Sequence, residues 1–109
     1  GITIIMDCIK IGSKLGAKCL LLPIGQPSEI SPEKARDNLY HSLMKCTELA
    51  AKYNMVLAVE NVVQLVLWTS QDLIELVDRV NSPYCKVYYD IGNPYFVNIN
   101  SADELLLGY

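Results

Sequence analysis

Three short apolar runs alternate with longer amphipathic segments along this chain of 109 residues. The runs are residues 18–24 (KCLLLPI), 55–59 (MVLAV) and 85–89 (CKVYY). Each is short and apolar, as strands of a parallel sheet are, and the first is predicted to be buried on both faces. They are spaced by about 30 residues, which leaves room for the helical crossover that joins consecutive parallel strands.

The segments between these runs have apolar residues at helical spacing and terminal signals at their ends. Gly16 suits the left-handed position after a helix. Ser31 followed by Pro32 predicts a helix N-terminus, and the sequence TSQD before the third helix resembles a capping box. The predicted helices cover residues 2–15, the segment from Pro32 to about Asn54, residues 70–80, and a last segment that opens at Ser101 after a loop over 91–100.

The predicted order α-β-α-β-α-β-α favours an α/β fold in which parallel strands are joined by right-handed helical crossovers. No glycine-rich phosphate-binding motif follows a strand, so the nucleotide-binding open sheets lose their main support. A closed (β/α)8 TIM barrel needs about 250 residues. We therefore predict that residues 1–109 form one partial TIM-barrel segment of about three β/α units.

Composition excludes several classes of function. The chain is 51% hydrophobic and only 19% charged, less polar than small soluble domains usually are, which favours part of a larger body. A net charge of −3 argues against a nucleic-acid partner. The sequence lacks an apolar stretch of the roughly 20 residues that cross a membrane, and residues 1–15 lack the basic n-region and the cleavage site expected of a signal peptide. Its four cysteines form no C-x-x-C pair, so we expect a reducing, cytoplasmic location.

Two consecutive predicted strands each end in a carboxylate. Glu60 follows the second strand and Asp90 follows the third. Because parallel strands end on one face of the sheet, where ligands bind in such folds, the two side chains can converge. Two adjacent carboxylates repel each other unless a cation lies between them, and divalent cations prefer oxygen ligands. The alternative is that each acid caps a helix or pairs with a lysine.

The segments LGAKCLLLP, AAKYNMVLAVEN and VNSPYCKVYYDIGN resemble the xylose-isomerase-like sugar-phosphate isomerase/epimerase family, which includes ketose and pentulose-phosphate 3-epimerases. The resemblance covers residues 2 to about 104. It implies a complete barrel that binds Mn²⁺, Mg²⁺ or a similar ion through a Glu, an Asp, a His and a second Glu. Glu60 corresponds to the first of these, which is also the catalytic acid/base, and Asp90 to the metal-binding Asp. The later His and Glu have no counterpart here, so half of the site is missing.

Four further residues are candidates for substrate binding. Asn93 occupies a position where some relatives have a substrate-contacting Asn and others a His. Asn61 could orient Glu60 or contact substrate, or it could be a turn former. Trp68 ends the apolar stretch 62–68, which could be a lid over the site, a contact with another subunit or a continuation of the core. The same alternatives apply to Tyr95. We expect His41 to be a helix surface residue, and Lys86 to pair with an acid at the bottom of the barrel.

We therefore predict a fragment of a divalent-metal-dependent sugar or sugar-phosphate isomerase or epimerase, which moves a proton through a metal-stabilised enediolate. One alternative is a non-catalytic barrel fragment that binds a partner or self-associates through exposed strand edges. Another is an apurinic-site endonuclease-like phosphodiesterase, which the negative charge and Asn93 disfavour. Expected partners are a sugar or sugar phosphate and either the remainder of the barrel or a second copy of the chain, in a homo-oligomer.

Overall fold

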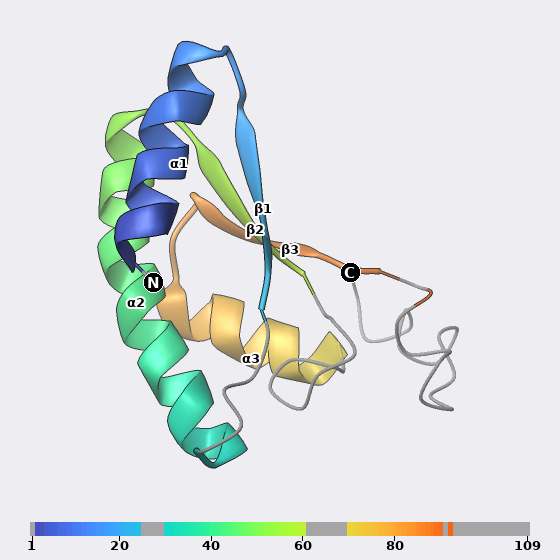
Figure 1. The fold of residues 1–109 in the computed structure, drawn as a ribbon. Coiled ribbons are helices and arrows are strands. Elements are labelled where there is room, and N and C mark those ends of the chain that lie inside the picture. The colour runs from blue at the N-terminus through green and yellow to red at the C-terminus, as the bar shows by residue number, and fades with distance from the viewer. Residues whose placement is uncertain (1, 25–29, 61–69, 91, 93–109) are drawn as a thin grey trace.

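The computed structural model describes residues 2–24, 30–60, 70–90 and 92 (Figure 1). The chain alternates helix and strand in the order α1 (Ile2–Lys14), β1 (Cys19–Pro23), α2 (Pro32–Lys52), β2 (Val56–Glu60), α3 (Ser70–Val80) and β3 (Cys85–Tyr88). The three predicted strands and the first three predicted helices are confirmed, with small shifts at their ends. The helix predicted from Ser101 lies outside the described residues.

The helix ends follow the local signals of the sequence. Ser31 is the N-cap of α2, and its Oγ accepts a hydrogen bond of 3.2 Å from the backbone N–H of Lys34. Gly16 after α1 has φ of 82°, a left-handed conformation that costs a glycine little. Asn54 and Asn81 follow α2 and α3 with φ of 53° and 51°, which asparagine tolerates better than most residues. These residues stop each helix and turn the chain into the next strand.

The three strands form one parallel sheet in the order β1-β2-β3. Pro23 lies beside Glu60, and Glu60 lies beside Tyr88, so these three residues define the carboxyl edge of the sheet. Consecutive strands are therefore neighbours in space, without the reversal of strand order found in doubly wound sheets.

All three helices cover the same face of the sheet (Figure 1). One hydrophobic cluster joins Ile9 of α1, Leu43 of α2 and Leu73 of α3 to the strands. Its fully buried larger side chains are Ile9, Leu43, Cys46, Met55, Leu57, Val59, Leu73 and Cys85. Parallel strands in sequential order with helices on a single face are the arrangement of a TIM barrel, so the predicted fold class is confirmed for this part of the chain.

The other side of the sheet, here called the open face, is less covered than the sequence predicts. Cys19 and Leu21 of β1 and Lys86 and Tyr88 of β3 are exposed on it, and only Ala58 of the central strand is buried there. The prediction that the first strand is buried on both faces is therefore wrong for this chain. In a closed barrel this face is the interior, which further strands fill with their own side chains.

Ion pairs link α2 to α3 at the surface. Arg79 contacts Asp37 at 2.8 Å and lies 3.9 Å from the centre of the Tyr40 ring, and Arg36 contacts Asp72 at 3.1 Å. The hydrogen bond from Arg79 lowers the pKa of Asp37. Exposed pairs of this kind contribute little to the free energy of unfolding, so the packing of the two helices depends mainly on their buried apolar side chains.

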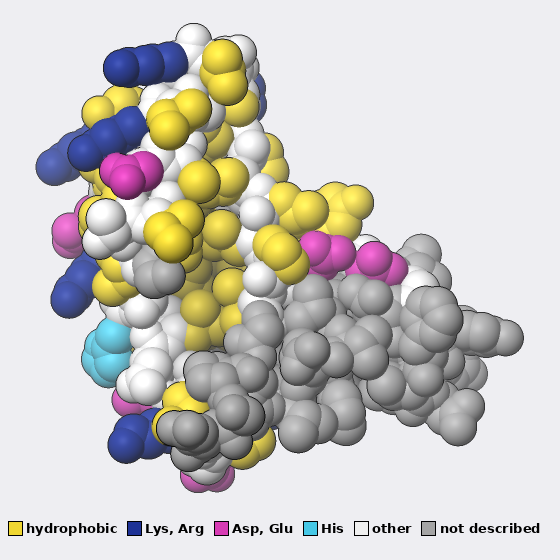
Figure 2. Space-filling model, in the orientation of Figure 1, with side chains coloured by type: hydrophobic (Ala, Val, Ile, Leu, Met, Phe, Trp, Pro, Cys, Tyr) yellow, Lys and Arg dark blue, Asp and Glu magenta, His cyan; other side chains and the backbone are white. Residues whose placement is uncertain are grey.

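α1 has a second apolar side that faces away from the core. Ile4, Ile11 and Leu15 are 66%, 59% and 82% exposed, and Cys8 between them is also exposed. These four residues, called the apolar stripe below, recur at intervals of three and four, so they form one line along the helix. Figure 2 shows hydrophobic side chains along this side of the molecule. Within the described part of the chain, no helix is both long and apolar enough to cross a membrane.

The Ser31 cap gives the first testable prediction. Ser31→Ala removes the acceptor for the Lys34 N–H and should lower the free energy of unfolding by about 1 kcal/mol, whereas Ser31→Asp keeps an acceptor and should be close to wild type. Urea denaturation followed by circular dichroism measures both. Equal stability of Ser31→Ala and wild type would show that this hydrogen bond does not contribute.

Candidate metal centre at the carboxyl edge of the sheet

The structure places the two predicted acids at the same edge of the sheet. Glu60 is the last residue of β2, and its neighbour on β3 is Tyr88. Asp90 follows Tyr88 by two residues and therefore continues along the side that Tyr88 occupies. Figure 2 shows acidic side chains next to each other in this region.

The two carboxyl groups interact directly. The pKa of Glu60 is raised, first by burial and then by the negative charge of Asp90 and a side-chain hydrogen bond with it. A hydrogen bond between two carboxyl groups requires that one of them carries a proton. A divalent cation can take the place of that proton, because it neutralises both charges and accepts oxygen ligands from each group. The donor set therefore fits a hard divalent cation.

Asp90 is held by a local turn. Its Oδ1 accepts a hydrogen bond of 2.7 Å from the backbone N–H of Gly92, two residues later. A Cβ atom at position 92 would lie 3.2 Å from the same oxygen, closer than side chains usually approach. Gly92 thus leaves space for the carboxylate to turn back onto the backbone. Gly92 was not among the residues predicted for the site, although the D-x-G spacing in YYDIGN was the available signal.

Other predicted site residues cannot be placed at this edge. Asn61, Trp68, Asn93 and Tyr95 lie outside the described residues. Within the described ranges, no group of three His, Cys, Asp or Glu side chains could hold a metal. Among the described residues, Glu60 and Asp90 are therefore a pair of candidate ligands.

The single histidine and the lysine of β3 lie elsewhere. His41 is a surface residue of α2, with Nε2 3.6 Å from Asp37, as expected. Lys86 is exposed on β3, and among the described residues no ion pair involves it. The acidic partner predicted for Lys86 is therefore not found in this part of the chain.

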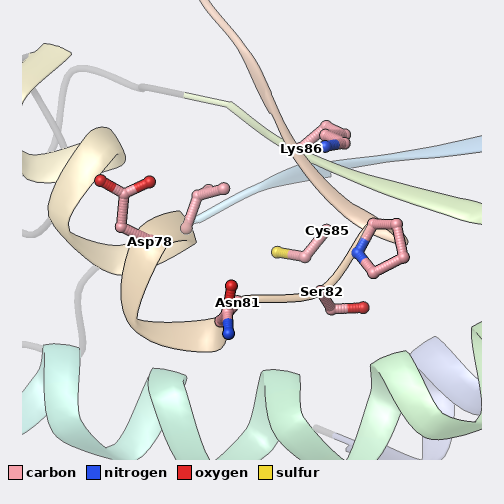
Figure 3. Close-up of a pocket in the computed structure, with 7 residues that line it drawn as sticks. Asp78, Asn81, Ser82, Cys85 and Lys86 are labelled. Carbon is pink, nitrogen blue, oxygen red and sulfur yellow. The ribbon is translucent and has the colours of Figure 1, made fainter.

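A hollow of about 480 Å³ lies at the opposite end of β3 (Figure 3). Its lining comes from the end of α3, the following turn and the start of β3, with Asp78, Cys85 and Lys86 among its residues. Burial raises the pKa of the Cys85 thiol to about 11, so this thiol is protonated near neutral pH and is a poor nucleophile. Asp78 is the one carboxylate among its lining residues, so Glu60 and Asp90 are the better candidates for a metal site.

The described elements define a segment of a parallel (β/α) barrel with acidic side chains at its carboxyl edge, where ligands bind in barrels of this type. A family profile described as xylose isomerase-like TIM barrel matches residues 1–108. The chain belongs to this family. No curated protein matches it in a sequence comparison.

Solved structures share the fold at low sequence identity. The 3-keto-D-glucoside 4-epimerase YcjR from E. coli superposes with a TM-score of 0.82 at 17% identity, over 97% of this chain and 45% of that one. D-psicose 3-epimerase, crystallised in the presence of D-fructose, gives 0.84 at 15% identity, over 97% and 40%. A xylose isomerase-like TIM barrel protein from Mycobacterium smegmatis in complex with magnesium gives 0.72 at 16% identity, over 84% and 35%. This chain thus spans less than half the length of each of these proteins.

The raised pKa of Glu60 predicts how stability depends on pH without metal. Between the ordinary glutamate pKa and the raised one, the folded protein binds more protons than the unfolded chain. Stability therefore falls as pH rises through that window, and the loss is complete above the raised pKa. Glu60→Gln removes this loss, so its melting temperature should exceed that of wild type by a margin that grows from pH 4 to pH 8.

The measurement is thermal unfolding in the presence of a chelator. Glu48→Gln, on the exposed side of α2, is the matched control. Its difference in melting temperature from wild type should not show the same increase from pH 4 to pH 8. A wild-type protein that gains stability over Glu60→Gln as pH rises would contradict this account of the pair.

Proposed function

We propose that this chain provides part of the active site of a divalent-metal-dependent sugar or sugar-phosphate isomerase or epimerase. The observation that carries the proposal is the direct interaction of Glu60 with Asp90 at the carboxyl edge of the sheet. Membership of the xylose isomerase-like family supports it, and so does the similarity in fold to two sugar epimerases.

In this proposal Glu60 and Asp90 hold the cation, and Glu60 also moves a proton. The Gly92 N–H keeps the Asp90 carboxyl group oriented, which suits a permanent ligand. A carboxylate at position 60 can remove a proton from the carbon next to the carbonyl of a ketose and return it. When bound, a divalent cation stabilises the negative charge that develops on the sugar oxygens.

Epimerisation needs a second acid or base on the other side of the sugar carbon, because the proton leaves one face and returns to the other. Within the described residues no further carboxylate or histidine joins the pair. In our proposal Asn61, Asn93, Trp68 and Tyr95 line the substrate site, and the remaining metal ligands come from other strands of a complete barrel.

Two surfaces of this chain suit those missing strands. β1 and β3 each pair only with β2 among the described strands, so each has an edge that can accept a parallel strand. The apolar stripe of α1 lies on the side that the core does not use. We propose that the remainder of a barrel, or a second copy of this chain, covers the stripe and continues the sheet, which places the protein in a homo-oligomer if the second copy is the partner.

Metal binding gives the direct test of the proposed function. Mn²⁺ at a hundredfold excess over its Kd should stabilise the native protein by about 2.7 kcal/mol, which raises the melting temperature by several degrees. Glu60→Gln and Asp90→Asn should each abolish most of this shift, and Glu48→Gln should keep it. An equal shift in wild type and both variants would place the ion elsewhere and remove the basis of the proposal.

Self-association tests the proposed role of the apolar stripe. Ile11→Glu puts a charge in the middle of the stripe and should lower the association of the isolated chain, as measured by analytical ultracentrifugation. Met44→Glu, at a position that is 39% exposed on α2, is the matched control. A wild-type chain that stays monomeric at high concentration, or equal effects of the two variants, would contradict association through the stripe.

A further inference from the structure

Among the described residues, Tyr88 is the aromatic residue closest in register to the acidic pair. It pairs with Glu60 across the parallel ladder and precedes Asp90 by two residues. Cys85 is buried and Val87 packs against the core, so the alternation of the strand directs Lys86 and Tyr88 to the open face. Tyr89 also packs against the core, whereas Tyr88 does not and is 51% exposed.

This position puts the ring within reach of anything that the pair binds. Neighbouring strands lie about 4.8 Å apart, and two residues along a strand cover about 6.6 Å. Tyr88 therefore stands beside Glu60 in one direction and next to Asp90 in the other, on the side of the sheet where their carboxyl groups meet.

The surroundings of Tyr88 on the open face are mainly apolar. Across the sheet, Tyr88 is level with Glu60 and Pro23. Two residues earlier on each strand, Lys86 is level with Ala58 and Leu21. An apolar floor with a few polar groups at one end is typical of a small-molecule site, in which the polar groups fix the orientation of the ligand. Here the polar end is the acidic pair, and the large exposed side chain next to it is an aromatic ring.

A ketose suits this combination. Its ring or chain presents C–H groups on one face and hydroxyls around the periphery, so the C–H face can pack on an aromatic ring while neighbouring oxygens reach a cation. Tyrosine offers a flat apolar surface together with a hydroxyl that hydrogen-bonds at its edge. We infer that Tyr88 is a substrate-binding residue of this site, whose ring supports the carbon skeleton of a ketose while Glu60 and Asp90 hold the cation. The inference rests on the proposed function, which it deepens by naming the floor of the site.

The test separates metal binding from sugar binding in the complete natural polypeptide that contains these residues. Isothermal titration gives the Kd of Mn²⁺ and then, at saturating Mn²⁺, the Kd of D-fructose and of D-ribulose 5-phosphate. The variants are Tyr88→Ala, Tyr88→Leu, which keeps an apolar side chain without a ring, and Tyr88→Phe, which keeps the ring. Tyr53→Leu, at a position 39% exposed beyond the end of α2, is the control for loss of an exposed tyrosine ring.

The expected result is an Mn²⁺ Kd within about twofold of wild type in every Tyr88 variant, and a ketose Kd raised roughly fivefold to tenfold in Tyr88→Ala and Tyr88→Leu. Tyr88→Phe and Tyr53→Leu should bind the ketose nearly as wild type does. The better of the two sugars shows whether the site takes a phosphate.

Two results would overturn the inference while the metal site stands: unchanged ketose affinity in Tyr88→Leu with normal Mn²⁺ binding, or a wild-type protein that binds Mn²⁺ but neither sugar. In both cases Tyr88 fills the interior of the barrel instead. Failure of Mn²⁺ to bind wild type would instead remove the proposed function itself. Tyr88→Leu keeps the experiment decisive if Tyr88→Ala does not fold, since it removes the ring and keeps an apolar side chain, while Tyr88→Phe tests the hydroxyl alone.

Discussion

The parallel register of β2 with β3 is the constraint on which the other features of this chain depend. It places Glu60 beside Tyr88 and brings Asp90 to the end of the sheet where Glu60 emerges. A shift of one residue would turn Tyr88 and Lys86 towards the helices and bury a lysine in the apolar cluster, at high cost. The same register keeps Cys85 and Val87 against α3, so core packing and site geometry select one alignment of the strands.

The acidic pair is a place where stability and binding compete. Burial and the charge of Asp90 both disfavour the ionised form of Glu60, so the pair is destabilising without a partner of opposite charge. The turn at Gly92 fixes Asp90 in spite of that repulsion. We propose that these two carboxyl groups, at the edge where barrels bind ligands, share a divalent cation, which would offset this destabilisation when it binds.

The fold could be predicted from the sequence because its signals are local. Ser31, Pro32, Gly16 and Asn54 set helix ends through hydrogen bonds and backbone preferences that involve only neighbouring residues. The ends of the strands depend instead on pairing with a neighbouring strand, which is not a local signal. Glu60 is part of β2 because it pairs with Tyr88. The burial of β1 was predicted wrongly, because an apolar run does not reveal whether a second layer covers it.

The candidate site could be predicted only in part for the same reason. Glu60 and Asp90 were found from their positions after two successive strands, which parallel topology brings together. Gly92 was not predicted because its role depends on a contact with the Asp90 side chain. Tyr88 was not predicted because its exposure depends on which face of the sheet it occupies. An acidic partner was expected for Lys86, but the sequence does not show which residues lie near it in space, and within the described residues no such partner is found.

We propose that the carboxylates of Glu60 and Asp90 share one divalent cation. Crystals of the protein soaked with Mn²⁺ and measured at a wavelength where manganese scatters anomalously would locate the ion directly. We expect a single anomalous peak within ligand distance of oxygens from both side chains. A peak bound elsewhere with both carboxylates uncoordinated, or coordinates in which the two groups point to opposite faces of the sheet, would contradict it.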